Sequence, residues 1–122
     1  MATQTREQCL IGALYDPGLR INWKTLWEKS HVQQLSGMLL RHGLIQVVAF
    51  LTRKANGSNG ENNEDERLVG LLEKTMRTVL TGQTFSLSLD NLAQQDALTL
   101  LGWNELAIEA AHWIEQVAAA KQ

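Results

Sequence analysis

Leucine, isoleucine, valine and methionine recur at intervals of three and four along almost all of this 122-residue chain. Such spacing places apolar side chains on one face of an α-helix, whereas a half-buried strand requires them at alternate positions. The chain has a single proline, Pro17, and few alternating β-branched runs. The pattern therefore predicts an all-α fold, a single compact bundle of about five to six helices.

The length is that of one domain, so we expect residues 1–122 to form a single all-helical domain. The segment 55–63 interrupts the apolar periodicity with glycine, asparagine and serine, which favour turns and bury little surface. We expect a flexible loop there. A single cysteine excludes an intrachain disulfide, and three widely separated histidines lack the spacing of a zinc site. We therefore expect no metal and no cofactor.

Turn and capping residues divide the pattern into helices. The first ends before Asp16-Pro17-Gly18, and a short second helix follows Asn22, a residue suited to the N-cap. We expect the helices to cover residues 4–15, a short stretch after 22, then 31–54, 64–81, 88–101 and 103–120.

Helix 31–54 is the expected long central helix, because apolar residues surround most of it from residue 38 onward. Gly37 and Gly43 in its interior predict a bend or the close approach of a neighbouring helix. Gly82 is expected to end the fourth helix, and Gly102 to separate the last two.

The formal net charge of −2 conceals a strong asymmetry. Residues 1–60 carry seven lysines and arginines against three acids, whereas residues 61–122 carry four against ten. Exposed charges interact weakly beyond the Debye length of about 8–10 Å. Residues 1–60 can therefore present a positive surface to phosphate, although the net charge of the whole chain is negative.

No arrangement of a nucleophile, a base and an orienting group is evident, and no glycine-rich phosphate loop is present. His112, three residues after Glu109, fits a surface pair better than a catalytic one. Trp23 and Trp27 share a helix face, where core packing, a protein interface or base stacking are the alternatives in that order. We expect the chain not to be an enzyme.

The segment "RHGLIQVVAFL", residues 41–51, carries a family resemblance through Arg41, Gly43, Leu44, Gln46, Ala49, Phe50 and Leu51. It resembles the central helix of the small subunit of type III-B CRISPR (Cmr) effector complexes. The loop at 55–63, the amphipathic helix after it and a closing helix with Ala110, Trp113 and an alanine run are also similar. The likeness covers most of residues 30–120.

The sequence departs from that family in two places. Residues 16–29 differ from the usual approach to the central helix, and Ile114, Glu115 and Gln116 stand where the family tends to carry basic residues. We therefore expect no RNA contact from the last helix.

The resemblance implies a non-catalytic subunit that stacks in several copies as an inner filament and positions target RNA along the guide RNA in antiviral defence. The implied partners are the backbone subunits, the large subunit, neighbouring copies, guide RNA and target RNA. A cytoplasmic location follows, and the polar amino end and the lack of a long apolar run indicate no membrane contact.

Within the motif, the resemblance assigns an RNA-facing role to Arg41. Charge placement adds other candidates, because cations spread over several helices suit an extended phosphate backbone. Three of them lie opposite the apolar stripe of the helix 64–81. The expected RNA-binding residues are Lys24, Arg41, Arg53, Lys54, Arg67, Lys74 and Arg77.

Two alternatives stay open. The chain could be the small subunit of a type III-A complex, or a helical protein-interaction adaptor whose basic side meets an acidic partner and never touches RNA.

Overall fold

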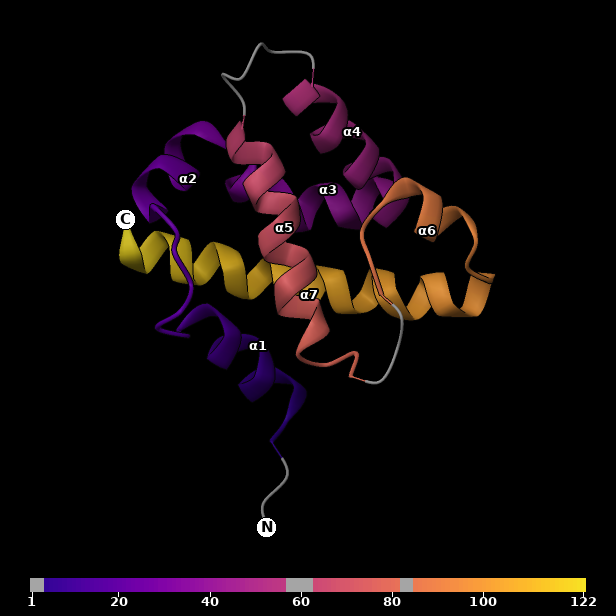
Figure 1. The fold of residues 1–122 in the computed structure, drawn as a ribbon, viewed down its shortest axis with the longest axis horizontal. Helices are drawn as coiled ribbons and strands as arrows, with labels where there is room; N and C mark the ends of the chain where they lie inside the picture. Colours follow the sequence, from indigo (N-terminus) through magenta and orange to yellow (C-terminus); the bar gives the residue numbers. More distant parts are fainter. Residues whose placement is uncertain (1–3, 57–62, 82–84) are drawn as a thin grey trace.

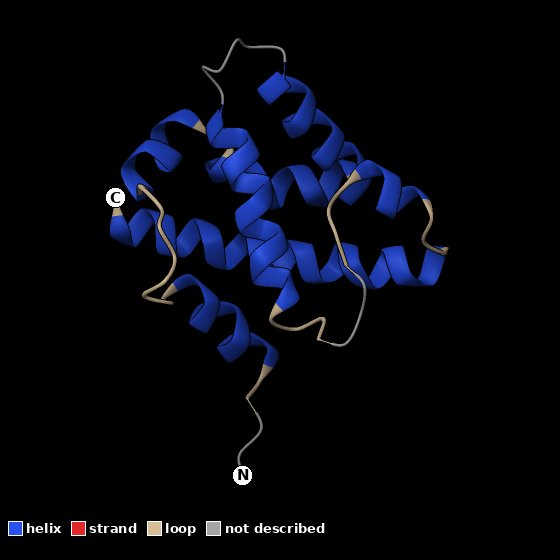
Figure 2. Cartoon of the chain, viewed as in Figure 1, coloured by secondary structure: helices blue, strands red, loops and turns tan. Residues whose placement is uncertain are grey.

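A computed structural model describes residues 4–56, 63–81 and 85–122, and the regular secondary structure of these segments is entirely helical (Figures 1 and 2). The α-helices are α1 (Arg6–Leu14), α2 (Trp23–Lys29), α3 (Leu35–His42), α4 (Leu44–Asn56), α5 (Asn63–Arg77), α6 (Leu89–Ala93) and α7 (Ala97–Lys121). A 3₁₀ turn, η1 (Val32–Gln34), precedes α3. The expected all-α bundle is confirmed.

Side-chain caps fix where several helices begin. Thr5 accepts a hydrogen bond from the backbone N–H of Gln8 at 3.1 Å, and Gln8 Oε1 accepts one from the backbone N–H of Thr5 at 2.8 Å. This reciprocal pair is a capping box at the start of α1. Asn22 Oδ1 accepts the N–H of Thr25 at 3.1 Å, which confirms the predicted cap of α2.

The expected long helix 31–54 is divided into η1, α3 and α4, so that prediction was wrong in its continuity. Gly43 ends α3 with φ 84° and ψ 166°, a conformation that is essentially restricted to glycine. The two helices bury different faces, since Leu35 and Leu39 are buried on α3 and the buried set of α4 begins five residues after Leu39, at Leu44. The break at Gly43 lets both faces reach the core.

The longest helix is instead α7, with 25 residues. We expected a break at Gly102, but α7 continues through it from the N-cap Asp96, whose side chain accepts the N–H of Thr99 at 2.8 Å. Gly102 is exposed, and nothing lies within 4 Å of the position that a β-carbon would occupy there. The only cost of Gly102 to α7 is therefore the lower helix propensity of glycine compared with alanine.

The predicted flexible loop at 55–63 lies mostly outside the described residues, as does Gly82. Its edges belong to helices, because α4 extends to Asn56 and α5 begins at Asn63.

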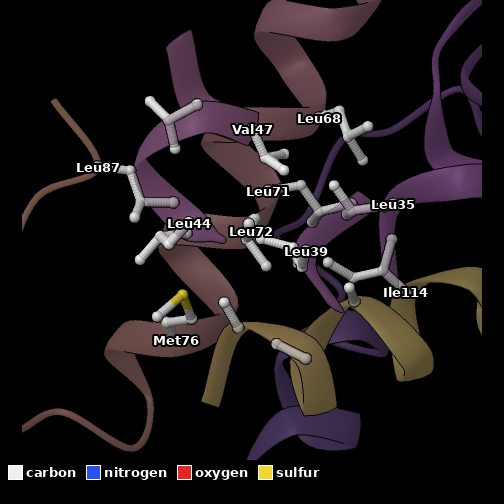
Figure 3. Packing of buried hydrophobic residues seen from close by; sticks show 14 of the residues in the cluster. Leu35, Leu39, Leu44, Val47, Leu68, Leu71, Leu72, Met76, Leu87 and Ile114 are labelled. Carbon is white, nitrogen blue, oxygen red and sulfur yellow. The ribbon is translucent and has the colours of Figure 1, made fainter. Parts of the chain in front are cut away.

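Helix α7 runs across the bundle and packs against α1, α2, α3, α4 and α5. Helix α5 crosses in front of it in Figure 1 and also contacts α1, α2 and α4. Their shared core contains Leu39, Leu68, Leu72, Met76 and Ile114, all fully buried (Figure 3). The central position thus belongs to α5 and α7 together.

The aromatic residues divide between the core and its margin. Trp103 is buried and meets the ring of Phe85 edge-on with centroids 4.7 Å apart. Trp23 and Trp27 are partly buried against the core. Phe50, a residue of the family motif, is exposed, and its ring meets that of His31 edge-on.

Candidate nucleic-acid interface

The outer face of α5 carries a row of cations. Arg67, Lys74 and Arg77 are exposed, while Leu68, Leu72 and their neighbours bury the opposite face. Because the cations are spaced at seven and three residues, they lie on one side of the helix and span about 15 Å along it. We call Arg67, Lys74 and Arg77 the α5 row.

Two members of the α5 row are paired with carboxylates of their own helix. Arg67 Nη1 lies 2.6 Å from Glu64 Oε1, and Arg77 Nη2 lies 3.4 Å from Glu73 Oε2. Arg77 Nη2 also donates to the carbonyl of Phe85 at 3.1 Å. Lys74 forms no ion pair within the described part of the chain. The positive field of the row is therefore weaker than the sequence alone suggests.

These pairs still leave the arginines able to bind an anion. Both arginine side chains are more than half exposed, although Glu64 is buried and Glu73 is half-buried, so each guanidinium keeps N–H donors that face solvent. A guanidinium carries five N–H donors, of which Arg67 uses one here. Phosphate can therefore be bound by the remaining donors without breaking the pair with Glu64.

The other predicted cations stand on three different helices. Lys24 lies on α2, Arg41 on α3 and Arg53 on α4, and all three are exposed. None forms an ion pair among the described residues. The Arg41 guanidinium folds back over Gly37, where a β-carbon would lie 3.5 Å from Nη2. Lys54 belongs to α4, but its side chain lies outside the described residues.

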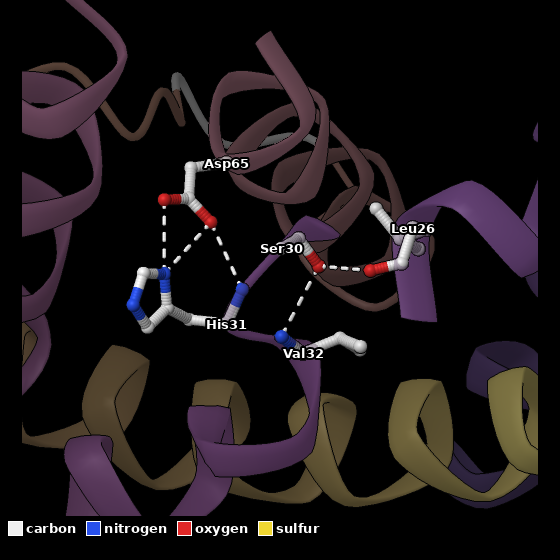
Figure 4. A network of polar contacts seen from close by, with 5 residues as sticks. All are labelled: Leu26, Ser30, His31, Val32 and Asp65. Atoms are coloured by element: carbon white, nitrogen blue, oxygen red, sulfur yellow. Dashed lines mark hydrogen bonds and ion pairs between the residues drawn. The ribbon is translucent and has the colours of Figure 1, made fainter. Parts of the chain in front are cut away.

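A buried polar network fixes the amino-terminal end of the α5 row (Figure 4). Asp65 is only 1% exposed, and its Oδ1 accepts the backbone N–H of His31 at 2.9 Å. The ring Nδ1 of His31 lies 2.9–3.0 Å from both carboxylate oxygens of Asp65. Ser30 Oγ links the same segment to α2 by donating to the carbonyl of Leu26. The contacts hold α5 against the connection between α2 and η1.

Sequence reasoning missed this network. At the start of α5 the structure buries Glu64 and Asp65 and leaves Glu66 exposed. His31 and Asp65 are 34 residues apart, so no local spacing could have indicated their contact. Buried acids require hydrogen-bond partners, and those of Asp65 came from a distant segment.

The described segments offer no group of three or more histidine, cysteine, aspartate or glutamate residues that could hold a metal ion. Glu109, which we associated with His112, instead binds Arg6 on α1, with Nε to Oε2 at 2.7 Å. No helix among the described residues is long and apolar enough to cross a membrane.

Comparison with known proteins gives one family match. A family model described as CRISPR-associated protein (Cas_Cmr5) matches residues 28–121, which include α3, α4, α5 and α7. No curated protein and no solved structure matches the chain significantly. The match begins within α2 and leaves out α1, so it falls on the part of the sequence where the resemblance was noted.

Proposed function

This chain belongs to the CRISPR-associated Cmr5 family, the small subunits of type III-B complexes, and from that premise we propose that it is a non-catalytic subunit that positions target RNA along guide RNA. In this proposal several copies stack as an inner filament beside the backbone subunits, with the large subunit as a further partner, in the cytoplasm. The family match favours type III-B over the type III-A alternative.

The α5 row is the observation that carries the RNA role. It supplies three exposed cations on one helix side, and α5 is held in place by its packing on α7 and by the Asp65 network. Contacts to phosphates position a strand without reading its sequence, as a subunit that must accept many guides requires. Lys24, Arg41 and Arg53 are the remaining candidates for such contacts.

A triple variant tests this role: Arg67→Ala, Lys74→Ala and Arg77→Ala, assembled into the complete complex. We expect loss of cross-linking between this subunit and target RNA, with the subunit composition unchanged. The matched control, Arg67→Lys, Lys74→Arg and Arg77→Lys, keeps the charge and should keep most of the cross-linking. Unchanged cross-linking in the alanine variant would remove the α5 row from the proposal.

The salt dependence of binding provides a second measure. If each copy contacts three to four phosphates, the logarithm of affinity for single-stranded RNA falls with the logarithm of salt with a slope of roughly −2 to −3, from about 0.7 per phosphate. The triple alanine variant should flatten that slope by about 2. A slope unaffected by the substitutions would place the contacts elsewhere.

The pairing of Arg67 and Arg77 with Glu64 and Glu73 favours one alternative, a protein-interaction adaptor without RNA contact. The substitution Glu73→Gln separates the two. It releases the charge of Arg77, while a glutamine oxygen can still accept the Leu87 N–H that Glu73 Oε1 binds at 2.7 Å. RNA affinity should rise if the row binds RNA, and should not change if the chain is only an adaptor.

A further inference from the structure

An apolar surface lies at the amino-terminal end of α7, away from the α5 row. Leu98 is 82% exposed and Leu101 is 56% exposed, and both lie on one side of the helix. Beside them a groove of about 550 Å³ runs between α7 and the start of α4, lined by Gly43, Ile45, Gln46, Ala97, Leu101 and Asn104. Exposed leucines grouped around a groove are typical of an interaction site.

Two exposed acids flank the α7 side of this groove. Asp96 precedes Ala97, and Glu105 continues the line of Leu98 and Leu101 along α7; both acids are exposed. Hydrogen bonds from the backbone and side chain of Thr99 hold the pKa of Asp96 below its ordinary range, so it is charged at neutral pH. Residues 85–120 contain no lysine or arginine. The titratable group that lines the groove from the α3–α4 side is His42.

The opposite end of the molecule is cationic. The carboxyl-terminal end of α7 packs near α2, at the far side of the bundle from α6 (Figure 1). Exposed cations there are Arg20, Lys24, Lys29 and Lys121, against the exposed acids Asp16 and Glu28. Lys121 Nζ lies 4.4 Å from the centre of the exposed Tyr15 ring. This end therefore offers positive charge beside aromatic surface.

We infer that the acidic, leucine-lined groove at the amino-terminal end of α7 binds the cationic α2 end of a second copy of this chain. The inference rests on the proposed function and assigns its copy-to-copy contact to two surfaces. One end supplies leucines and carboxylates, and the other supplies lysines and arginines. Because the two surfaces differ, the contact is heterologous and leaves a free surface at each end of the pair. Further copies can then add in the same way.

Self-association of the full chain tests the contact, followed by sedimentation velocity over a range of concentrations. We expect open-ended association that Leu98→Glu with Leu101→Glu weakens about tenfold or more, as for central apolar interface residues. The matched control is Leu40→Glu, since Leu40 is 70% exposed on α3 and does not line the groove. A wild-type chain that stays monomeric, or a control that weakens association equally, would overturn the inference.

Charge reversal tests the pairing of the two ends. Lys29→Glu with Lys121→Glu should weaken association, and adding Glu105→Lys should restore part of it. Zero-length cross-linking of a mixture of unlabelled and isotope-labelled chains, in solution and in the complete complex, should join Asp96 or Glu105 to Lys24, Lys29 or Lys121 between copies. Groove-to-groove cross-links, or cross-links from the groove to another subunit, would overturn the inference.

These results are separable from those on RNA. The groove variants leave the α5 row intact, so RNA binding by a single copy should persist when association is lost. Conversely, the triple alanine variant of the α5 row should associate normally.

Discussion

Gly43 allows a test in which the sign of the effect decides between two structures. In a continuous helix 31–54, Gly43→Ala would stabilise the protein, because alanine favours a helix interior over glycine by about 0.5–1 kcal/mol. In the structure described here, Gly43 has φ 84° and ψ 166°, so alanine must adopt a conformation that costs on the order of 1–3 kcal/mol.

The expected loss comes from the backbone and not from a clash. A β-carbon at Gly43 would meet only Asn104 Oδ1, at 4.0 Å, which is ordinary van der Waals contact. We therefore expect Gly43→Ala to lower the free energy of unfolding by about 1–3 kcal/mol. Urea denaturation followed by far-UV circular dichroism measures this change.

Gly102→Ala is the matched control, and its predicted effect has the opposite sign. Gly102 is inside α7 with open space around the β-carbon position, so alanine should stabilise the protein by about 0.5–1 kcal/mol. A stabilising Gly43→Ala would refute the break between α3 and α4. A destabilising Gly102→Ala would refute the continuity of α7.

Three further predictions concern the core and the caps. Asp65→Ala leaves the N–H of His31 buried without its acceptor and should cost about 1–3 kcal/mol in urea denaturation, whereas Glu66→Ala, at an exposed position, should stay within about 0.5 kcal/mol. Because the folded pKa of Asp96 is lowered, its carboxylate stabilises the fold above the ordinary carboxyl pKa of about 4 and loses that contribution as the pH falls, so stability curves of wild type and Asp96→Asn should converge in acid. Trp103→Ala opens a cavity beside Phe85 and should cost about 3–5 kcal/mol, with loss of near-UV circular dichroism, while a cost below about 1 kcal/mol would contradict the packing.

Local signals predicted the elements whose ends are set by their own residues. The cap at Asn22 and the stop before Asp16-Pro17-Gly18 needed no tertiary information. The exposed position of the α5 row also followed from helical spacing, because polar and apolar residues separate cleanly on α5.

The two glycines show where such reasoning stops. A helix tolerates glycine at a cost of about 1 kcal/mol, so a glycine inside a periodic pattern can lie in a helix or end it. Packing decides: α3 and α4 break at Gly43 because they bury different faces, whereas α7 is one helix across Gly102. The sequence carries a sign of the break. The buried positions Leu39 and Leu44 are five residues apart, whereas one helix face repeats every three or four residues.

The ion pairs of Arg67 and Arg77 follow the i,i+3 and i,i+4 spacing of one helix, whereas the contact between His31 and Asp65 depended on a neighbour 34 residues away. Charge counting treats every lysine and arginine alike, but the pairs reduce the field of two arginines and leave that of Lys74 whole. Replacing Lys74 alone should therefore weaken RNA binding more than replacing Arg67 or Arg77 alone.

The uninterrupted α7 also has a mechanical consequence. Its 25 residues form a rod about 37 Å long, braced along its length by five other helices. Compressing or stretching that rod would require breaking backbone hydrogen bonds and separating its neighbours at the same time. A partner bound at one end of α7 is therefore held at a constant distance from a partner bound at the other end. A single helix, with no loop, connects the two binding positions.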